Sequence, residues 1–537
     1  MPIRMTDDPQ DQQEQFENPG GGGGNYPVGP GGGGGGGLLS LLPMLLSLFG
    51  GRGGGGKGLF LLLIVGGLAY FILGRGGCNM SQLAELATGG FLDPKQFEKA
   101  EIYEPLADDD SKNPLPESAN LQRYCPTPQN QGSQGSCVAW SSAFAAHTIL
   151  EATKTGKQPD QVAFSPSFMY NQIGLEGCQG SYIIRAMEFM TQKGGVPYND
   201  FPYTDQDCSN QPGNQLMQEA TQFRMRGFNR LSQGDRNDKI DLRAIKENLS
   251  QGAPVVIGMM VGQSFMQPMM GQDLWTPADG DKSMMGFGGH AMCVVGYDDK
   301  KYGGAFLIMN SWGKEWGNNG FGWVRYGDFQ YYVREAYGVS PMHPGNENVQ
   351  QFACEIGLVT VQYDGKKTVA GDYIPLRNNG GNRFETRGPV AAGTRFKMEI
   401  KNSTECYIYV FGKETDGTSY TLFPYPRTDD PSKTKYSPYC GITGYRLFPK
   451  DKSMMPDSIG NRDVMAVVVS KKELNWHELN QQISSDPSAD YGSRLNRALG
   501  SALIRNVRYS ATGNGNLRFD VTGDTNDVVA CIIEVTK

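Results

Sequence analysis

The sequence predicts an α+β region followed by a mostly β-sandwich region, with one membrane-spanning helix ahead of both. Three observations carry this prediction. Residues 141–152 are small or apolar and contain no helix breaker, which is typical of a helix. Two apolar runs, residues 291–297 and 305–309, have the length of buried strands. After residue 346 short alternating runs dominate, which is the pattern of a β-sandwich.

The bulk composition narrows the function classes. A length of 537 residues leaves room for two or three domains. The net charge of −7 offers no basic surface, so the sequence argues against nucleic acid as a partner. Ten cysteines are compatible with a few disulfides in an exported protein. With only four histidines, few residues compete for the role of a general base.

The first 57 residues are predicted to be a disordered, glycine-rich tail because they lack the apolar content of a core. Residues 38–49 are apolar, but Pro43 interrupts them and they are too short to span a bilayer. An interfacial or re-entrant segment is one alternative for them.

Residues 58–74 are predicted to be a transmembrane helix. These seventeen residues carry no charge and are flanked by Lys57 and Arg75. At 1.5 Å per residue they cover about 26 Å, which just suffices for a thin hydrocarbon core. A buried helix is disfavoured because the flanking segments offer nothing to pack against. Arg52 and Lys57 precede the span and Arg75 follows it, so we expect the N-terminus inside and the catalytic region outside, periplasmic or extracellular.

Residues 75–120 are predicted to be a linker with a short helix near residues 94–102. Beyond the linker, residues 131–136 form a glycine-rich turn that leads into Cys137. A cysteine at a helix N-terminus is favoured as a thiolate by the helix dipole and the free N–H groups. Such a thiolate is a nucleophile that needs a base.

Among the histidines, His290 is the best candidate for that base. His147 lies ten residues along the same helix, about 15 Å from Cys137 along the axis, and is expected to be structural. His343 belongs to a boundary loop and His477 to a distant segment. Asn310 follows His290 by twenty residues, and neighbouring strands would let it accept the ring N–H of His290.

These motifs resemble the papain family of cysteine peptidases. The resemblance covers residues 121–342 in the family's order and suggests a bacterial, membrane-anchored member with two lobes, one helical and one a β-barrel. The matching segments are residues 131–140, 177–181, 289–291, 310–313 and 316–322.

The resemblance implies catalytic roles. Cys137 would attack the scissile carbonyl, and His290 would be its ion-pair partner and then the acid for the leaving amine. Asn310 would orient His290 while Trp312 shields that hydrogen bond. Gln131 would donate its side-chain amide to the oxyanion together with the backbone N–H of Cys137.

It also implies a substrate cleft that needs neither metal nor cofactor. Gly180 and Ser181 would line the cleft and bind the substrate backbone. The pocket for an apolar substrate side chain would be formed by Tyr182, Ile183, Gly258 and Ala291.

The sequence departs from the family in three places. Gln134 stands where the family has a bridging cysteine, so Cys178 is free or paired elsewhere, with Cys208 nearest in sequence. Val138 replaces the aromatic residue that usually follows the nucleophile. The family's helical propeptide of about a hundred residues is missing, because only some forty residues separate the predicted anchor from the peptidase region.

After a linker at residues 343–349, residues 350–537 are predicted to be a β-sandwich with helices near residues 476–483 and 494–504. They weakly resemble a bacterial accessory domain of uncertain function, for which docking of a protein partner is our hypothesis. Four cysteines in this region, Cys354, Cys406, Cys440 and Cys531, could form two disulfides, but the sequence does not determine which cysteines pair. The predicted strands are residues 357–363, 395–401, 406–412, 420–423, 464–470, 516–521 and 528–536.

The sequence therefore predicts a membrane-anchored cysteine endopeptidase that cleaves peptides or proteins. The alternative from another class is an anchored, non-catalytic protein that uses the same fold to bind peptides. A third hypothesis is an exopeptidase or an acyl transferase.

Overall fold

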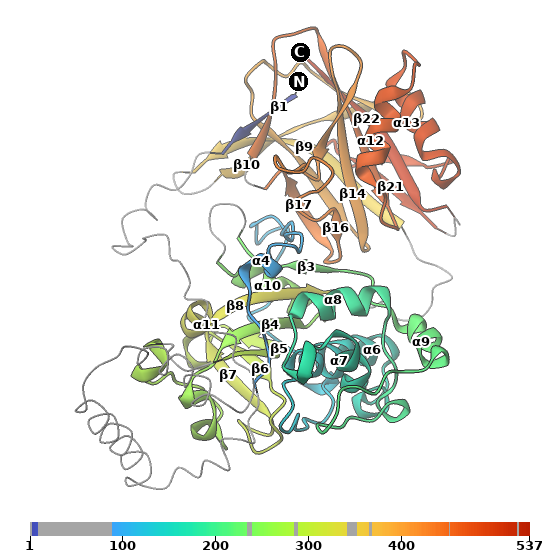
Figure 1. The fold of residues 1–537 in the computed structure, drawn as a ribbon. Coiled ribbons are helices and arrows are strands. Elements are labelled where there is room, and N and C mark those ends of the chain that lie inside the picture. Colours follow the sequence, from blue (N-terminus) through green and yellow to red (C-terminus); the bar gives the residue numbers. More distant parts are fainter. Residues whose placement is uncertain are drawn as a thin grey trace, which may run out of the picture.

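A computed structural model of the chain describes residues 3–8, 88–233, 239–283, 288–340, 352–364, 368–450, 452–522 and 526–537. These residues form two domains, one above the other in Figure 1. The α+β domain consists of residues 88–340. The β domain consists of residues 352–537 together with residues 3–8, which join its sheet.

An antiparallel sheet of seven strands organises the α+β domain. Its order is β3-β8-β4-β5-β6-β7, with β2 paired to β5. The two strands expected from the apolar runs are present as the neighbours β5 and β6. The strands are β2 (Ser118–Asn120), β3 (Phe228–Arg230), β4 (Val255–Met260), β5 (Gly289–Asp298), β6 (Ala305–Met309), β7 (Phe321–Arg325) and β8 (Val333–Val339).

Helices pack beside this sheet and share one apolar core with it. The helix expected at residues 141–152 is present, but its first part is a π-helix, η3 (Trp140–His147). The other helices are α4 (Pro94–Phe97), α5 (Cys137–Ala139), α6 (Thr148–Thr155), α7 (Pro166–Ile173), α8 (Ile183–Gln192), α9 (Asn214–Ala220), α10 (Leu242–Ser250) and α11 (Tyr326–Tyr332).

The β domain is built from two sheets with an apolar core between them. The first sheet has the order β1-β18-β13-β9-β21-β20, and β10 and β17 pair with β9 and β13. Its strands are β1 (Ile3–Asp7), β9 (Phe352–Tyr363), β10 (Thr368–Ile374), β13 (Phe396–Asn402), β17 (Gly444–Phe448), β18 (Lys452–Pro456), β20 (Tyr509–Ala511) and β21 (Leu517–Val521).

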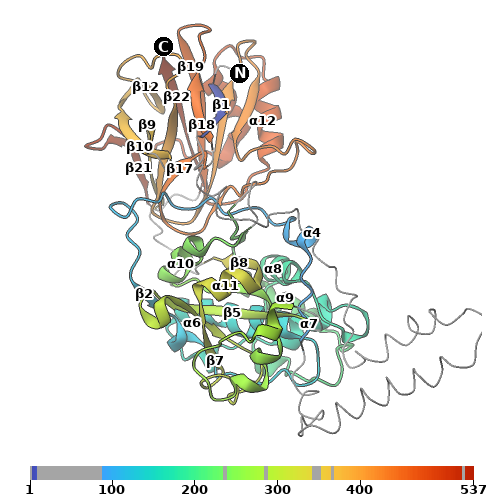
Figure 2. The same cartoon turned by 90° about the vertical axis from the view of Figure 1, so that its left-hand side faces the viewer.

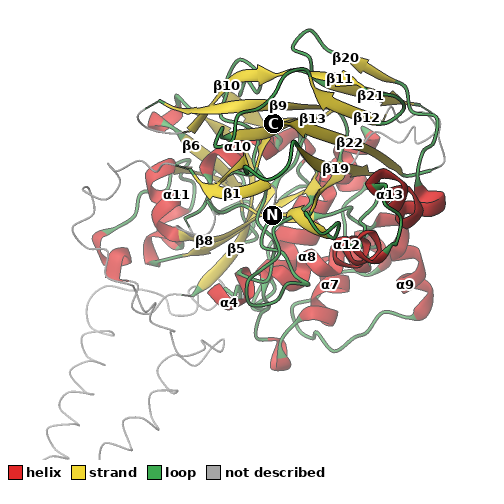
Figure 3. Ribbon diagram, turned by 90° about the horizontal axis from the view of Figure 1, so that it is seen from above, coloured by secondary structure: helices red, strands yellow, loops and turns green. Residues whose placement is uncertain are grey.

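The second sheet has the order β11-β12-β22-β19-β14-β15, with β16 on β14. A second apolar cluster lies between this sheet and two helices, which lie along one side of the domain in Figure 3. These elements are β11 (Leu376–Asn378), β12 (Arg383–Thr386), β14 (Cys406–Lys413), β15 (Ser419–Phe423), β16 (Tyr439–Cys440), β19 (Arg462–Ser470), β22 (Val528–Thr536), α12 (Trp476–Ser485) and α13 (Tyr491–Leu499).

All seven strands and both helices expected in the β domain are present. The additional strands are short or polar, or they lie at a sheet edge, so they carry a weak alternating pattern. The two bridges that the sequence allowed are not formed: Cys354, Cys406, Cys440 and Cys531 are all free thiols in the buried interior. Cys406 and Cys440 are nevertheless direct cross-strand neighbours.

The segment ahead of the α+β sheet, which we call the strap (residues 88–107), runs between the two domains. Ile102 is fully buried. Its backbone forms isolated β-bridges with Arg230 on β3 and with Tyr436 of the β domain. Its N–H donates to the carbonyl of Lys435 (2.7 Å), and its carbonyl accepts from the N–H of Ser437 (2.8 Å). In Figure 2 the strap with α4 passes between the domains. The β domain therefore holds the strap in place.

Within the described ranges, no helix is long and apolar enough to cross a membrane. Residues 58–74, where the transmembrane helix was expected, lie outside those ranges. The same is true of His343 and of the expected linker at residues 343–349.

Candidate active site

Hydrogen bonds fix the turn that presents Cys137. The hydroxyl of Tyr203 donates to the carbonyl of Gln131 (2.7 Å) and lies 2.6 Å from the Ser136 hydroxyl and 3.3 Å from Oε1 of Gln134. A carboxylate oxygen of Asp205 accepts the backbone N–H of Ser133 at 3.0 Å. This network stabilises the turn without the bridge that the family usually places at residue 134.

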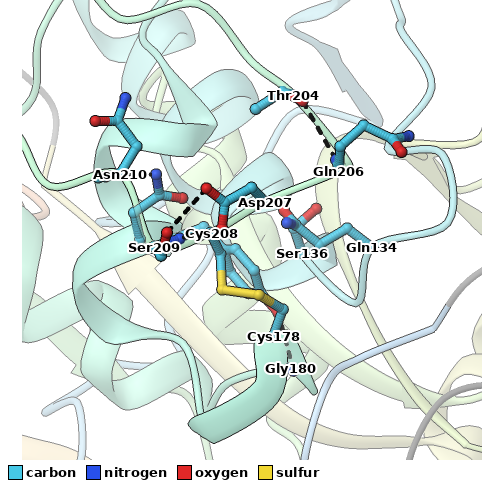
Figure 4. The surroundings of a disulfide bond; sticks show 12 residues. Gln134, Ser136, Cys178, Gly180, Thr204, Gln206, Asp207, Cys208, Ser209 and Asn210 are labelled. Carbon is cyan, nitrogen blue, oxygen red and sulfur yellow. Dashed lines mark hydrogen bonds between the residues drawn. A yellow bond between two sulfur atoms is a disulfide. The ribbon is translucent and has the colours of Figure 1, made fainter.

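Cys178 forms a disulfide with Cys208, the nearest candidate in sequence. Figure 4 shows the bridge beside Gln134 and Ser136 of this turn. The bridge joins the segment before α8 to the segment after Tyr203. The bridge therefore ties the segment that carries Tyr203 and Asp205 covalently to the segment before α8.

Cys137 begins α5 and is completely buried. Its sulfur accepts the backbone N–H of Ala291 at 3.4 Å. Burial raises the pKa of this thiol to about 12, although backbone N–H groups, including that of Gly89, act in the opposite direction. The helix end alone was expected to favour the thiolate. In this structure desolvation outweighs it, so the thiol is protonated at neutral pH.

His290 lies at the start of β5 with its ring held on two sides. Its Nε2 is 2.7 Å from Oδ1 of Asn310, so the expected hydrogen bond is present. Trp312 stacks on the ring at 4.3 Å between centroids and covers that bond. Nδ1 has no hydrogen-bond partner among the described residues and is left to act on a proton. Burial lowers the pKa of His290 to about 4, so the ring is neutral.

Gln131 connects the two halves of the site. Its Nε2 donates to the carbonyl of Gln134 at 2.9 Å, and its Oε1 accepts from the hydroxyl of Ser311 at 2.7 Å. Its backbone N–H donates to the carbonyl of Ser311. The side chain is completely buried. These bonds set the orientation of the amide, while its role toward an oxyanion stays a prediction.

The other described histidines lie outside this constellation. His147 is buried, stacks on Phe164 at 4.0 Å, and has a pKa lowered to about 4 by burial. His477 lies on α12 in the β domain. Among the described residues, no cluster of His, Cys, Asp or Glu could hold a metal ion.

The chain's own strap fills the cleft where a substrate backbone was expected. The N–H of Gly90 donates to the carbonyl of Gly289 (3.1 Å), and the N–H of Phe91 donates to the carbonyl of Ser181 (3.0 Å). In return the N–H of Ser181 donates to the carbonyl of Gly89 (3.0 Å). A Cβ on Gly180 would lie only 2.3 Å from that carbonyl oxygen, so glycine is required there. The strap thus occupies the cleft through its backbone.

The side chain of Leu92 occupies the expected pocket. A Cβ on Gly258 would lie 2.4 Å from Cδ2 of Leu92 and 3.1 Å from Cδ1 of Ile183. Phe91 packs against Tyr182 with ring centroids 5.8 Å apart. The residues predicted to bind substrate are therefore gathered around residues 89–92, including Ala291, which lies beside Gly90. Their part in binding a substrate stays a prediction.

Glu335 is a pocket residue that the sequence did not reveal. It lies opposite Gly258 in the pairing of β4 with β8 and is buried. Its carboxyl group accepts the N–H of Asp93 (3.2 Å) and the hydroxyl of Tyr337 (3.3 Å). Burial raises its pKa to about 8. The only signal in the sequence is a carboxylate that follows Arg334 in the otherwise apolar or small residues 333–339.

The site contains a buried thiol at a helix start, an imidazole oriented by an amide, and a covered cleft. These are the parts of a cysteine peptidase of the Cys-His-Asn type. Residues 115–341 match the family model described as papain family cysteine protease, so this part of the chain is similar to that family.

The chain is also similar in sequence to curated cathepsins. The chain is 28% identical over 253 residues to cathepsin K of Mus musculus, covering 46% of this chain and 70% of the relative. It is 27% identical over 243 residues to cathepsin L2 of Homo sapiens, covering 42% and 64%. Among solved structures, xylellain, a cysteine protease from Xylella fastidiosa, matches with a TM-score of 0.39 at 22% identity, covering 48% of this chain and 97% of that one.

Proposed function

We propose that this chain hydrolyses peptide bonds with Cys137 as the nucleophile and that the described state is a latent one. The observation that carries the proposal is the strap in the cleft. Three backbone hydrogen bonds and the Leu92 side chain hold it over Cys137 and the hydrogen-bonded pair of His290 and Asn310. A substrate can reach Cys137 only after residues 88–92 have been displaced or cut.

The geometry supports the following chemistry. Nδ1 of His290 takes the Cys137 proton, and the sulfur attacks the scissile carbonyl carbon. The N–H of Cys137 and the amide of Gln131 stabilise the oxyanion. The imidazolium then protonates the leaving amine, the C–N bond breaks, and a thioester forms. A water molecule, deprotonated by His290, hydrolyses the thioester and restores the thiol.

Release of the strap also prepares the nucleophile. The shifted pKa values of Cys137 and His290 both result from burial. When the strap leaves, water enters, the pKa of the thiol falls and that of the imidazole rises. The ion pair then becomes accessible near neutral pH. Because Leu92 fills the pocket, we propose substrates with an apolar side chain at the corresponding position.

The cellular setting is part of the proposal. We propose a bacterial protein that is attached to the membrane through residues 58–74, with the catalytic domain outside the cytoplasm. The uncharged length of that segment supports the attachment. The disulfide between Cys178 and Cys208 supports an oxidising compartment. We further propose that the β domain docks a protein partner.

Labelling of the full chain with an epoxysuccinyl inhibitor, followed by mapping of the modified residue, tests this function. We expect an adduct on Cys137, none in Cys137→Ala, and hydrolysis of end-blocked peptides under mild reduction. Failure of both labelling and hydrolysis after the strap has been removed would leave the non-catalytic peptide-binding alternative. Cleavage of free-ended peptides alone would indicate an exopeptidase, and acyl transfer to an added amine would indicate a transferase.

A further inference from the structure

The first strand of the chain completes the β domain. Strand β1 pairs antiparallel with β18 along its whole length, from Ile3 opposite Pro456 to Asp7 opposite Lys452. The two strands lie side by side at the edge of the first sheet (Figure 2). Without β1 the backbone groups of β18 would be an open edge, which proteins usually cover.

The fit includes side chains as well as backbone. Ile3 is 1% exposed and belongs to the core between the two sheets. The hydroxyl of Tyr420 accepts the N–H of Ile3 (3.2 Å) and donates to its carbonyl (3.3 Å). Met5 lines a small apolar cavity together with Leu422 and Met454. The β domain thus presents a shaped site for this strand.

A buried charge provides a second, independent observation. The ammonium group of Lys397 is inside the domain and pairs with Oδ2 of Asp8 at 2.6 Å, with the side chains 4% and 10% exposed. Its other contacts are the neutral carbonyls of Pro449 (2.8 Å) and Lys450 (2.7 Å). Ser453 hydrogen-bonds the other oxygen of Asp8. Because a buried ammonium group needs a counter-charge, the domain is built around the carboxylate that follows β1.

We propose that this edge of the β domain is a docking site for the chain's own residues 3–8, and that these residues lie on the same side of a membrane as the peptidase. A single crossing between residues 8 and 88 would place β1 and β18 on opposite sides. Intramolecular pairing and the expected single-pass topology with an inside N-terminus therefore exclude each other.

Disulfide trapping in membranes from cells that produce the full chain tests this proposal. Arg4 and Met455 are direct partners with outward-facing side chains, so the pair Arg4→Cys and Met455→Cys should close on mild oxidation. The control combines Arg4→Cys with Gln215→Cys, at an exposed position on α9 of the α+β domain, and should not close. A crosslink within one chain is expected. A crosslinked dimer, or no crosslink in a chain that is folded, would overturn the proposal.

A second pair of variants separates docking from chance contact. Ile3→Asp places a charge in the core and should reduce the crosslink yield at least fivefold. Ile459→Asp makes the same chemical change at a side chain that is 55% exposed and should leave the yield unchanged. Equal yields in the two variants would contradict a specific site for Ile3. Because the readout is a crosslink rather than hydrolysis, the result is independent of the proposed peptidase activity.

Discussion

Leu92→Ala should convert part of the latent population into an open, reactive one. The substitution leaves the strap backbone intact and removes only the side chain that fills the pocket beside Gly258. Full burial of a leucine contributes about 2–3 kcal/mol, and Leu92 is half-buried, so the loss is about 1–1.5 kcal/mol. At about 1.4 kcal/mol per factor of ten, the open fraction should rise roughly 5- to 12-fold.

The assay is the rate at which a thiol-directed inhibitor labels Cys137 in the uncut chain, measured by intact mass. That rate is proportional to the open fraction while opening is rare. The matched control is Leu216→Ala on α9, which makes the same change at a partly buried leucine outside the cleft and should leave the rate unchanged. If Leu92→Ala is labelled no faster than the unmodified chain, the strap does not restrain the site.

Four further outcomes are expected. Gly89→Ala should raise the labelling rate at least tenfold, because its Cβ would lie 2.2 Å from a backbone oxygen of the catalytic turn and expel the strap; an unchanged rate would contradict the clash. Asn310→Ala in the Gly89→Ala background should lower kcat about 100-fold with little change in KM, because the imidazole loses its orientation; steady-state kinetics give both values. Burial in the docked state raises the pKa of Glu335 to about 8, so this state binds the extra proton and docking should weaken as pH rises from about 4.5 to 8. The ratio of labelling rates between wild type and Glu335→Gln should therefore rise across that window, and a flat ratio would refute the coupling. Replacing both Cys178 and Cys208 by Ala should lower the free energy of unfolding by about 2–4 kcal/mol in denaturant titrations, and an unchanged midpoint would count against the bridge.

The sequence predicted the structure correctly where the local pattern of one segment determines its conformation. The apolar runs at residues 291–297 and 305–309 placed His290 and Asn310 on neighbouring strands, and the structure shows their side chains in hydrogen-bonding contact. Periodicity also identified α12, α13 and the long strands of the β domain. In each case one segment carries enough signal to determine its own conformation.

Features that depend on distant segments were not predictable. Residues 88–92 look like linker because they contain two glycines and no alternation, yet they pair with Ser181 and Gly289. The pKa of the Cys137 thiol is set mainly by its burial in the folded chain, so the helix end alone gave the wrong direction. Glu335 gains its importance only when β8 lies beside β4. The pairing of β1 with β18 joins segments more than four hundred residues apart, for which a single sequence gives no signal.

The most direct test of the central claim, a complete but covered Cys-His-Asn site, is the time course of inhibitor adducts on the full chain and on Gly89→Ala. Peptide mapping should place a single adduct on Cys137 in both, forming at least tenfold faster in Gly89→Ala and not at all in Cys137→Ala. A Gly89→Ala chain that is folded but neither acquires an adduct at Cys137 nor cleaves a peptide would contradict the account.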